Sequence, residues 1–144
     1  MTYADSSFFF SYYASDTSSP RADAWRLEHP APLPFSSLNR LELRNALELA
    51  VFQKRIPPKE SSEAWQTVES DLHDGLLIPT PLLFADVFRE AELLAANHTA
   101  QVGTRSLDLL HIAAARLLGV AELVTFDQRQ VTLATRLNLL LAVL

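Results

Sequence analysis

The sequence predicts an α/β protein in which a central, mostly parallel sheet is covered by helices on both faces, a three-layer α/β/α arrangement. Along its 144 residues, short apolar stretches typical of strands alternate with longer stretches of helical periodicity. Hydrophobic residues make up 49% of the chain and charged residues 20%, which is the balance of a folded globular protein. This length suits one core, so we expect a single domain over residues 1–144.

The first half of the chain shows this alternation clearly. We expect strands at 3–5 and 33–36, helices at 21–29, 37–55 and 60–73, and a short helix or turn at 6–13. Pro20 suits the first position of a helix, whose N–H has no partner within the helix, and Pro57 ends the long helix at 37–55. The long helix is predicted from the helical spacing of Leu38, Leu41, Ala46, Leu47, Leu49 and Phe52.

The second half continues the pattern. We expect strands at 76–79, 122–127 and 139–144, and helices at 83–97, 107–118 and 128–137. Gly119 is the residue type that commonly ends a helix. The last strand is expected to be buried, because it is the longest apolar run of the chain.

Charge and composition limit the classes of function. The net charge is −5, so the global field of the protein does not attract nucleic acid. Either the protein binds no nucleic acid, or it contacts nucleic acid locally through bound metal and a few arginines. There are no cysteines, which excludes disulfides and thiolate metal sites. No signal peptide or membrane span is evident, so we expect a cytoplasmic protein that does not contact the membrane.

Four acidic residues from distant parts of the sequence are expected at one edge of the sheet. Sites in open parallel sheets form outside the carboxyl ends of the strands. Asp5 and Asp127 end predicted strands, whereas Glu42 and Asp108 lie in early turns of predicted helices. Each acid alone could instead cap a helix or complement a helix dipole. Together they would repel one another unless something positive lay among them, so we interpret the four as one site.

A divalent hard cation is the expected partner of these acids. Mg²⁺ and Mn²⁺ prefer oxygen ligands, and one or two such ions would suit the set. A cation held by carboxylates can lower the pKa of a bound water and stabilise the charge on a phosphate. We therefore predict hydrolysis of phosphodiester bonds, with Asp5, Glu42, Asp108 and Asp127 as both catalytic residues and metal ligands.

Several neighbouring residues are candidates for supporting parts. Ser6 and Thr125 could orient a ligand carboxylate or a water molecule, although backbone turn or cap hydrogen bonds would explain them too. Arg105 could contact a phosphate. His111 is predicted to be a hydrogen-bonded core histidine rather than a metal ligand. The remaining candidates, which could equally be solvated helix residues, are Arg40, Arg44 and Arg129.

Four ordered segments resemble the PIN-domain family and, within it, the VapC-type toxins of bacterial toxin–antitoxin pairs. The segments are Tyr3-Ala4-Asp5-Ser6-Ser7, Leu41-Glu42-Leu43, residues 105–115 (RSLDLLHIAAA) and Leu123-Val124-Thr125-Phe126-Asp127. Their order and spacing match the family along nearly the whole chain. One departure is Asn39, where many relatives carry Ser or Thr.

The resemblance implies an endoribonuclease that depends on Mg²⁺ or Mn²⁺, with the same four acids as metal ligands. It also implies a homodimer, an RNA substrate and an antitoxin protein as the inhibitory partner. Two other hypotheses remain open: a nuclease that acts on DNA, and a non-enzymatic interaction module that keeps the fold. The presence of all four acids favours an enzyme over the module.

Overall fold

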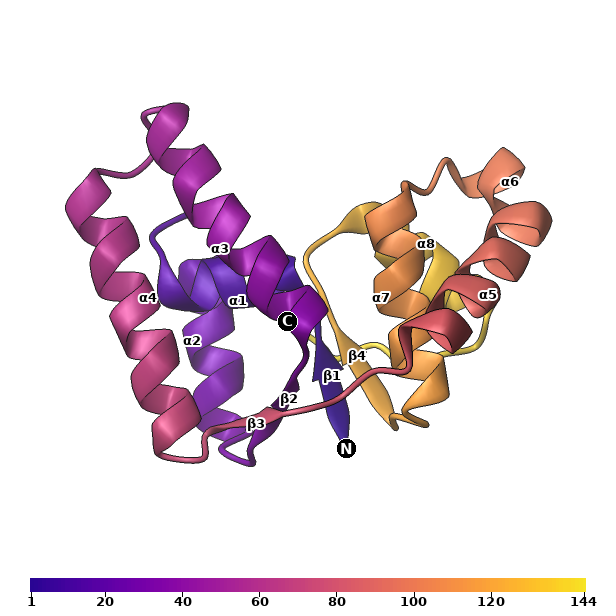
Figure 1. Ribbon diagram of the computed structural model, residues 1–144, viewed down its shortest axis with the longest axis horizontal. Helices are drawn as coiled ribbons and strands as arrows, with labels where there is room; N and C mark the ends of the chain where they lie inside the picture. Colours follow the sequence, from indigo (N-terminus) through magenta and orange to yellow (C-terminus); the bar gives the residue numbers. More distant parts are fainter. The chain divides into compact units, whose positions relative to one another are not determined.

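All paired strands are parallel in the computed structural model, which describes residues 1–144 (Figure 1). Strand β1 (Thr2–Ala4) pairs with β4 (Glu122–Val124), and β2 (Leu33–Phe35) pairs with β3 (Leu77–Pro79). Parallel strands need helical crossover connections, and the chain supplies them. The predicted α/β class with parallel strands is therefore confirmed.

Helices make up most of the remaining chain (Figure 1). They are α1 (Ser6–Tyr13), α2 (Ser19–Glu28), α3 (Ser37–Phe52), α4 (Pro58–His73), α5 (Phe84–Leu94), a π-helical turn η1 (Ala95–Thr99), α6 (Ala100–Val102), α7 (Ser106–Leu117) and α8 (Gln128–Arg136). The predicted helices are all present, with ends that differ by a few residues. No helix is long and apolar enough to span a membrane.

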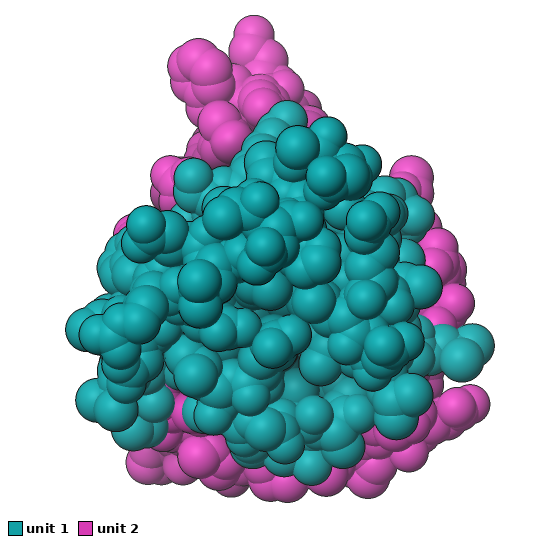
Figure 2. Space-filling model, turned by 90° about the vertical axis from the view of Figure 1, so that its right-hand side faces the viewer, with its two compact units in different colours: residues 1–5, 81–143 teal, residues 6–80, 144 magenta.

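The chain divides into two compact units, which Figure 2 distinguishes by colour. The first unit consists of residues 1–5 and 81–143, and the second consists of residues 6–80 and 144. Each unit contains one parallel strand pair, β1 with β4 in the first and β2 with β3 in the second. The boundary between Asp5 and Ser6 separates two adjacent residues of the predicted site.

Helix α7 forms the centre of the first unit. Its residues 108–115 are buried, and the small side chains of Ala113, Ala114 and Ala115 allow it to pack closely against α5. His111, which is 1% exposed, shares a hydrogen bond of 2.7 Å between its Nδ1 and the Tyr3 hydroxyl of β1. This is the arrangement expected of a core histidine.

Aromatic side chains of α1 form the centre of the second unit. Phe8 and Phe9 are both fully buried. Phe8 meets Trp25 of α2 edge-to-face at 5.2 Å between ring centroids, and Phe9 meets Phe35 of β2 in the same way at 5.2 Å. The short apolar helix thus joins α2 and β2 into one core.

The start of α3 shows what Asn39 does. Ser36 caps the helix, and its backbone N–H donates to Asn39 Oδ1 at 3.0 Å. The N–H of Asn39 donates in return to Ser36 Oγ at 3.3 Å. Asn39 is completely buried, and these two hydrogen bonds make it the second residue of a capping box.

The inward face of α3 differs from the spacing that predicted the helix. Leu38 and Leu47 are buried, but Leu41 and Phe52 are 69% and 82% exposed. Apolar residues at helical spacing predict a helix, but they do not specify which side of the helix faces the core. The elements that pack against the helix decide which side is buried.

The prediction of a buried strand at 139–144 is wrong. The segment makes one isolated parallel bridge, between Leu123 and Leu141. The Leu123 N–H donates to Leu140 at 2.8 Å, and the Ala142 N–H donates to Leu123 at 2.9 Å, after which the pairing stops. Val143 is 94% exposed. A continuous apolar run is compatible with a strand but does not create a neighbouring strand of matching length.

A hydrogen bond between α1 and α4 predicts how stability depends on pH. The Tyr13 hydroxyl donates to Asp71 Oδ2 at 2.6 Å. Burial, and then the bond to Asp71, raises the pKa of the Tyr13 phenol far above its usual value. The native protein therefore keeps this proton at a pH where the unfolded chain, with a tyrosine pKa of about 10, loses it. The stabilisation is intact below about pH 10 and is lost as the pH rises above it.

We expect Tyr13→Phe to remove this pH dependence. Below about pH 9 the variant is less stable than the wild type by about 1–2 kcal/mol, because the hydrogen bond is lost. Above about pH 10 the difference shrinks by about 1.4 kcal/mol per pH unit. Urea unfolding of both proteins between about pH 8 and 11 measures it. A difference that stays constant over this range would contradict the assignment to Tyr13.

Candidate functional site

Asp5 lies directly after β1 and is the most buried of the predicted acids, with 1% of its surface exposed. Its N–H donates to the Val124 carbonyl at 3.1 Å, which continues the pairing of β1 with β4. The Oδ2 atom accepts two hydrogen bonds, from Thr125 Oγ1 and from Gln130 Nε2, each at 2.9 Å. The carboxylate is therefore held in place from one side.

Asp108 lies in the first turn of α7, as predicted, and is 7% exposed. Its Oδ2 accepts from the backbone N–H of Arg105 at 2.9 Å. The N–H groups at the start of a helix have no partner within the helix, and the helix dipole also favours a negative charge there. Local structure thus fixes the Asp108 carboxylate at the amino end of α7.

Asp127 is the N-cap of α8. Its Oδ1 accepts from the backbone N–H of Arg129 at 2.8 Å and of Gln130 at 3.2 Å. Its own N–H donates to Thr125 Oγ1 at 3.0 Å, the hydroxyl that donates to Asp5. Asp127 is therefore a helix cap, and Thr125 connects it to Asp5.

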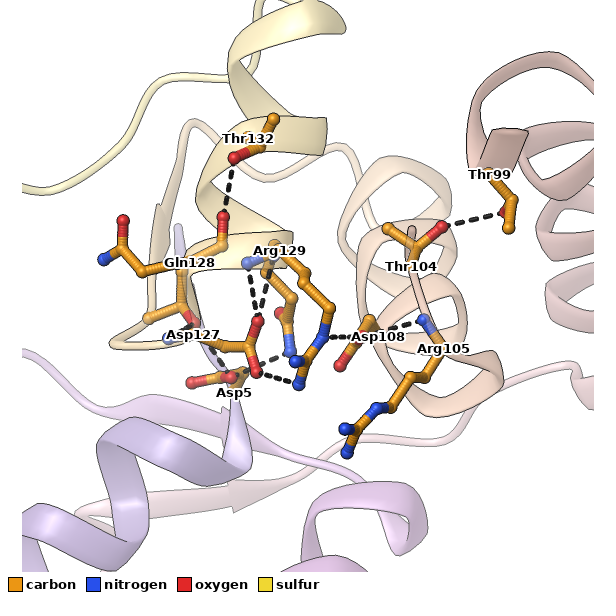
Figure 3. A network of polar contacts seen from close by, with 11 residues as sticks. Asp5, Thr99, Thr104, Arg105, Asp108, Asp127, Gln128, Arg129 and Thr132 are labelled. Atoms are coloured by element: carbon orange, nitrogen blue, oxygen red, sulfur yellow. Dashed lines mark hydrogen bonds and ion pairs between the residues drawn. The ribbon is translucent and has the colours of Figure 1, made fainter. Parts of the chain in front are cut away.

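Arg129 joins two of the acids. Its Nε donates to Asp108 Oδ2 at 2.9 Å, and its Nη2 donates to Asp127 Oδ2 at 2.8 Å (Figure 3). The hydrogen bond to Asp108, and then the charge of Asp127, raises the pKa of the Arg129 guanidinium above its usual value. One planar cation therefore compensates two carboxylates from different helices.

Glu42 and Ser6 belong to the second unit and contact each other there. Ser6 Oγ donates to Glu42 Oε2 at 2.9 Å, from the first residue of α1 to α3. Ser6 therefore orients the Glu42 carboxylate.

The other predicted arginines have different surroundings. Arg105 is exposed, and its backbone N–H rather than its guanidinium donates to Asp108. Arg40 pairs with Glu69 and Arg44 pairs with Glu48, and both guanidinium groups lie over the ring of Trp65. These two belong to the surface of α3 and α4.

The predicted set omitted Gln130 and did not distinguish Arg129 from the other arginines. Gln130 is 3% exposed and shares the buried face of α8 with Leu133 and Ala134. A glutamine three residues before a buried leucine is a usable signal, because a buried polar side chain needs a partner. That partner, Asp5, lies 125 residues away in the chain, and nothing in the sequence around Gln130 indicates it.

The chemistry of these donors fits a hard divalent cation. Asp5, Asp108 and Asp127 supply carboxylate oxygens, the ligands that Mg²⁺ and Mn²⁺ prefer. Gln130 Oε1 is buried without a hydrogen-bond partner, although its Nε2 holds Asp5. No group of three or more His, Asp or Glu side chains is arranged to hold an ion in this structure. Figure 3 shows the guanidinium of Arg129 paired with Asp108 and Asp127.

Comparison with known proteins identifies one family and several similar solved structures. The family model for the PIN domain matches residues 2–135, which run through both units. No curated protein matches the sequence.

Two of the similar solved structures are bacterial proteins. The toxin VapC20 of Mycobacterium tuberculosis, described as cleaving the sarcin-ricin loop, is similar with a TM-score of 0.69 and 16% identity, over 92% of this chain and 94% of that one. FitAcB from Neisseria gonorrhoeae is similar with a TM-score of 0.60 and 16% identity, over 98% of this chain and 96% of that one. At this identity the similarity establishes the fold.

Proposed function

Because the chain belongs to the PIN-domain family, we propose that it is an endoribonuclease dependent on Mg²⁺ or Mn²⁺ and the toxin of a toxin–antitoxin pair. The observation that carries the proposal is the polar network of the first unit. It links Asp5, Asp108 and Asp127 through Thr125, Gln130 and Arg129. Three acids from distant segments belong to this one network, and acids gathered in one polar network mark a candidate functional site.

The protein side chains position the reaction. Thr125 and Gln130 hold one oxygen of Asp5, and the amino ends of α7 and α8 hold Asp108 and Asp127. A cation bound by these carboxylates supplies acidification of water and stabilisation of the negative charge on phosphate. Because hydrogen bonds anchor three of the acids, these side chains would lose little conformational freedom on binding a cation.

Glu42 is proposed as the fourth ligand. Its support is the hydrogen bond from Ser6, which follows Asp5 directly in the chain, and the family pattern at residues 41–43. Arg105 is proposed as a phosphate contact, because its side chain is exposed and its own backbone N–H donates to Asp108. Local contacts of this kind suit a chain whose net charge is −5.

The partners follow from the same proposal. RNA is the substrate, an antitoxin protein is the inhibitor, and the active form is a homodimer in the cytoplasm. The similarity of the fold to VapC20 of Mycobacterium tuberculosis supports the toxin assignment.

Cleavage by purified protein, freed from any bound partner, tests the function. We expect Mn²⁺ or Mg²⁺ to produce cleavage of a structured RNA, and EDTA to abolish it. A DNA of the same sequence should remain intact. Cleavage of the DNA alone would select a DNA nuclease, and no cleavage of either substrate with either ion would select a non-enzymatic module.

A further inference from the structure

The guanidinium of Arg129 holds Asp108 and Asp127, which are less deeply buried than Asp5. Its Nε is 2.9 Å from Asp108 Oδ2, and its Nη2 is 2.8 Å from Asp127 Oδ2. The side chains of Asp108 and Asp127 are 10% and 21% exposed. Two acids so close to each other need a positive charge, and in this structure Arg129 provides it.

Arg129 holds only part of each carboxylate. Asp108 Oδ1 takes part in neither the bond from Arg129 nor the bond from the Arg105 N–H, both of which use Oδ2. Asp127 directs Oδ1 to the backbone of α8 and Oδ2 to Arg129. Removal of the guanidinium would therefore leave both carboxylates anchored by backbone N–H groups. Both would lose the positive charge that Arg129 supplies.

The Arg129 side chain can leave without disturbing the core. It is 36% exposed, and Arg129 stands in the first turn of α8, where its backbone N–H remains bonded to Asp127. A long side chain at the end of a helix can turn into water, where its charge is hydrated, so that its departure costs only the two ion pairs. By contrast, Asp5 and Gln130 are buried and remain in place.

We propose that Arg129 is the resident countercharge of this site and that a divalent cation binds only by displacing its guanidinium, so that Arg129 sets the metal affinity. The inference rests on the proposed metal-dependent function and adds a competing ligand to it. A cation and a guanidinium cannot occupy the same carboxylate oxygens, and each repels the other. Arg129 therefore keeps the metal-free protein stable and weakens metal binding, and both effects come from the same two ion pairs.

The test compares Arg129→Gln with wild type and with Arg136→Gln. Arg136 lies on the same helix and is exposed, so its variant changes the net charge equally. Free Mn²⁺ is measured by electron paramagnetic resonance during titration of the metal-free proteins, and thermal melting is followed with and without Mn²⁺. We expect Arg129→Gln to bind Mn²⁺ at least about tenfold more tightly and to melt at a lower temperature without metal. Arg136→Gln should match wild type in both measurements.

The outcomes separate this inference from the proposed function. If wild type binds Mn²⁺ and Arg129→Gln binds it equally or more weakly, the inference is overturned and the metal site stands. If Arg136→Gln gains as much affinity as Arg129→Gln, net charge is the cause and the inference is overturned. If no protein binds Mn²⁺, the metal site and the inference both fail. Should Arg129→Gln not fold, Arg129→Lys keeps a charge that cannot bridge both carboxylates, and about threefold tighter binding is expected.

Discussion

Asp5→Asn is expected to reduce metal-dependent cleavage of RNA at least about a hundredfold, because several kcal/mol of electrostatic stabilisation depend on charged ligands. Asp5 is the most buried acid of the set, and its position is fixed by Thr125 and Gln130. Asparagine has nearly the same size and keeps an oxygen that can accept from both donors. The loss is therefore expected from the missing charge and not from a change of fold.

Three measurements make this result specific. The circular dichroism spectrum of Asp5→Asn should equal that of wild type, while its affinity for Mn²⁺ falls. Asp23→Asn, which removes an exposed carboxylate on α2, should retain full activity. Full activity of Asp5→Asn would remove Asp5 from the proposed metal site. Unfolding of the variant would show that Asp5 is needed for folding. Asp108→Asn would then test the site.

Phe9→Ala is expected to destabilise the protein by about 3–5 kcal/mol, the usual cost of truncating a buried phenylalanine. Phe9 is fully buried, packs edge-to-face on Phe35 at 5.2 Å and stacks near Tyr13 at 6.3 Å between ring centroids. Its removal leaves a cavity between α1 and β2 and loses both ring contacts. Since small domains have about 5–15 kcal/mol of stability in all, the variant should be close to unfolding.

A matched variant distinguishes burial from the loss of any phenylalanine. Phe52→Ala removes the same atoms from the end of α3, where the ring is 82% exposed. We expect its stability to change by less than about 0.5 kcal/mol. Urea unfolding of both variants measures the difference. A loss at Phe52 as large as that at Phe9 would mean that this exposed ring is covered in the folded protein by another chain.

Much of the architecture was predictable because it depends on residues near one another in the chain. Pro20 in the first turn of α2, Ser36 at the start of α3 and Asp108 in the first turn of α7 act within three or four positions of themselves. Capping and helical periodicity act over the same short distance. The order of strands and helices, and with it the parallel sheet class, follows from these local preferences.

The environment of the acids was predictable only in part. The sequence placed Asp108 in a first helical turn, which is confirmed, and Asp5 as the last residue of a strand that ends one residue earlier, at Ala4. Asp127 has the helix-cap role that was its alternative explanation. Whether the four acids together bind metal stays a prediction, which the Asp5 and Arg129 variants address.

By itself the sequence determined the helices, the short strands between them and the segments that carry the acids. Only the tertiary structure decided that Thr125 and Gln130 hold Asp5 across 120 and 125 residues, and that Arg129, alone among ten arginines, joins Asp108 to Asp127. It also decided that Leu41 is exposed and that residues 139–144 make a single bridge. The physical reason is that hydrogen bonds of caps and turns are chosen locally, whereas burial and ion pairing depend on which distant elements pack together.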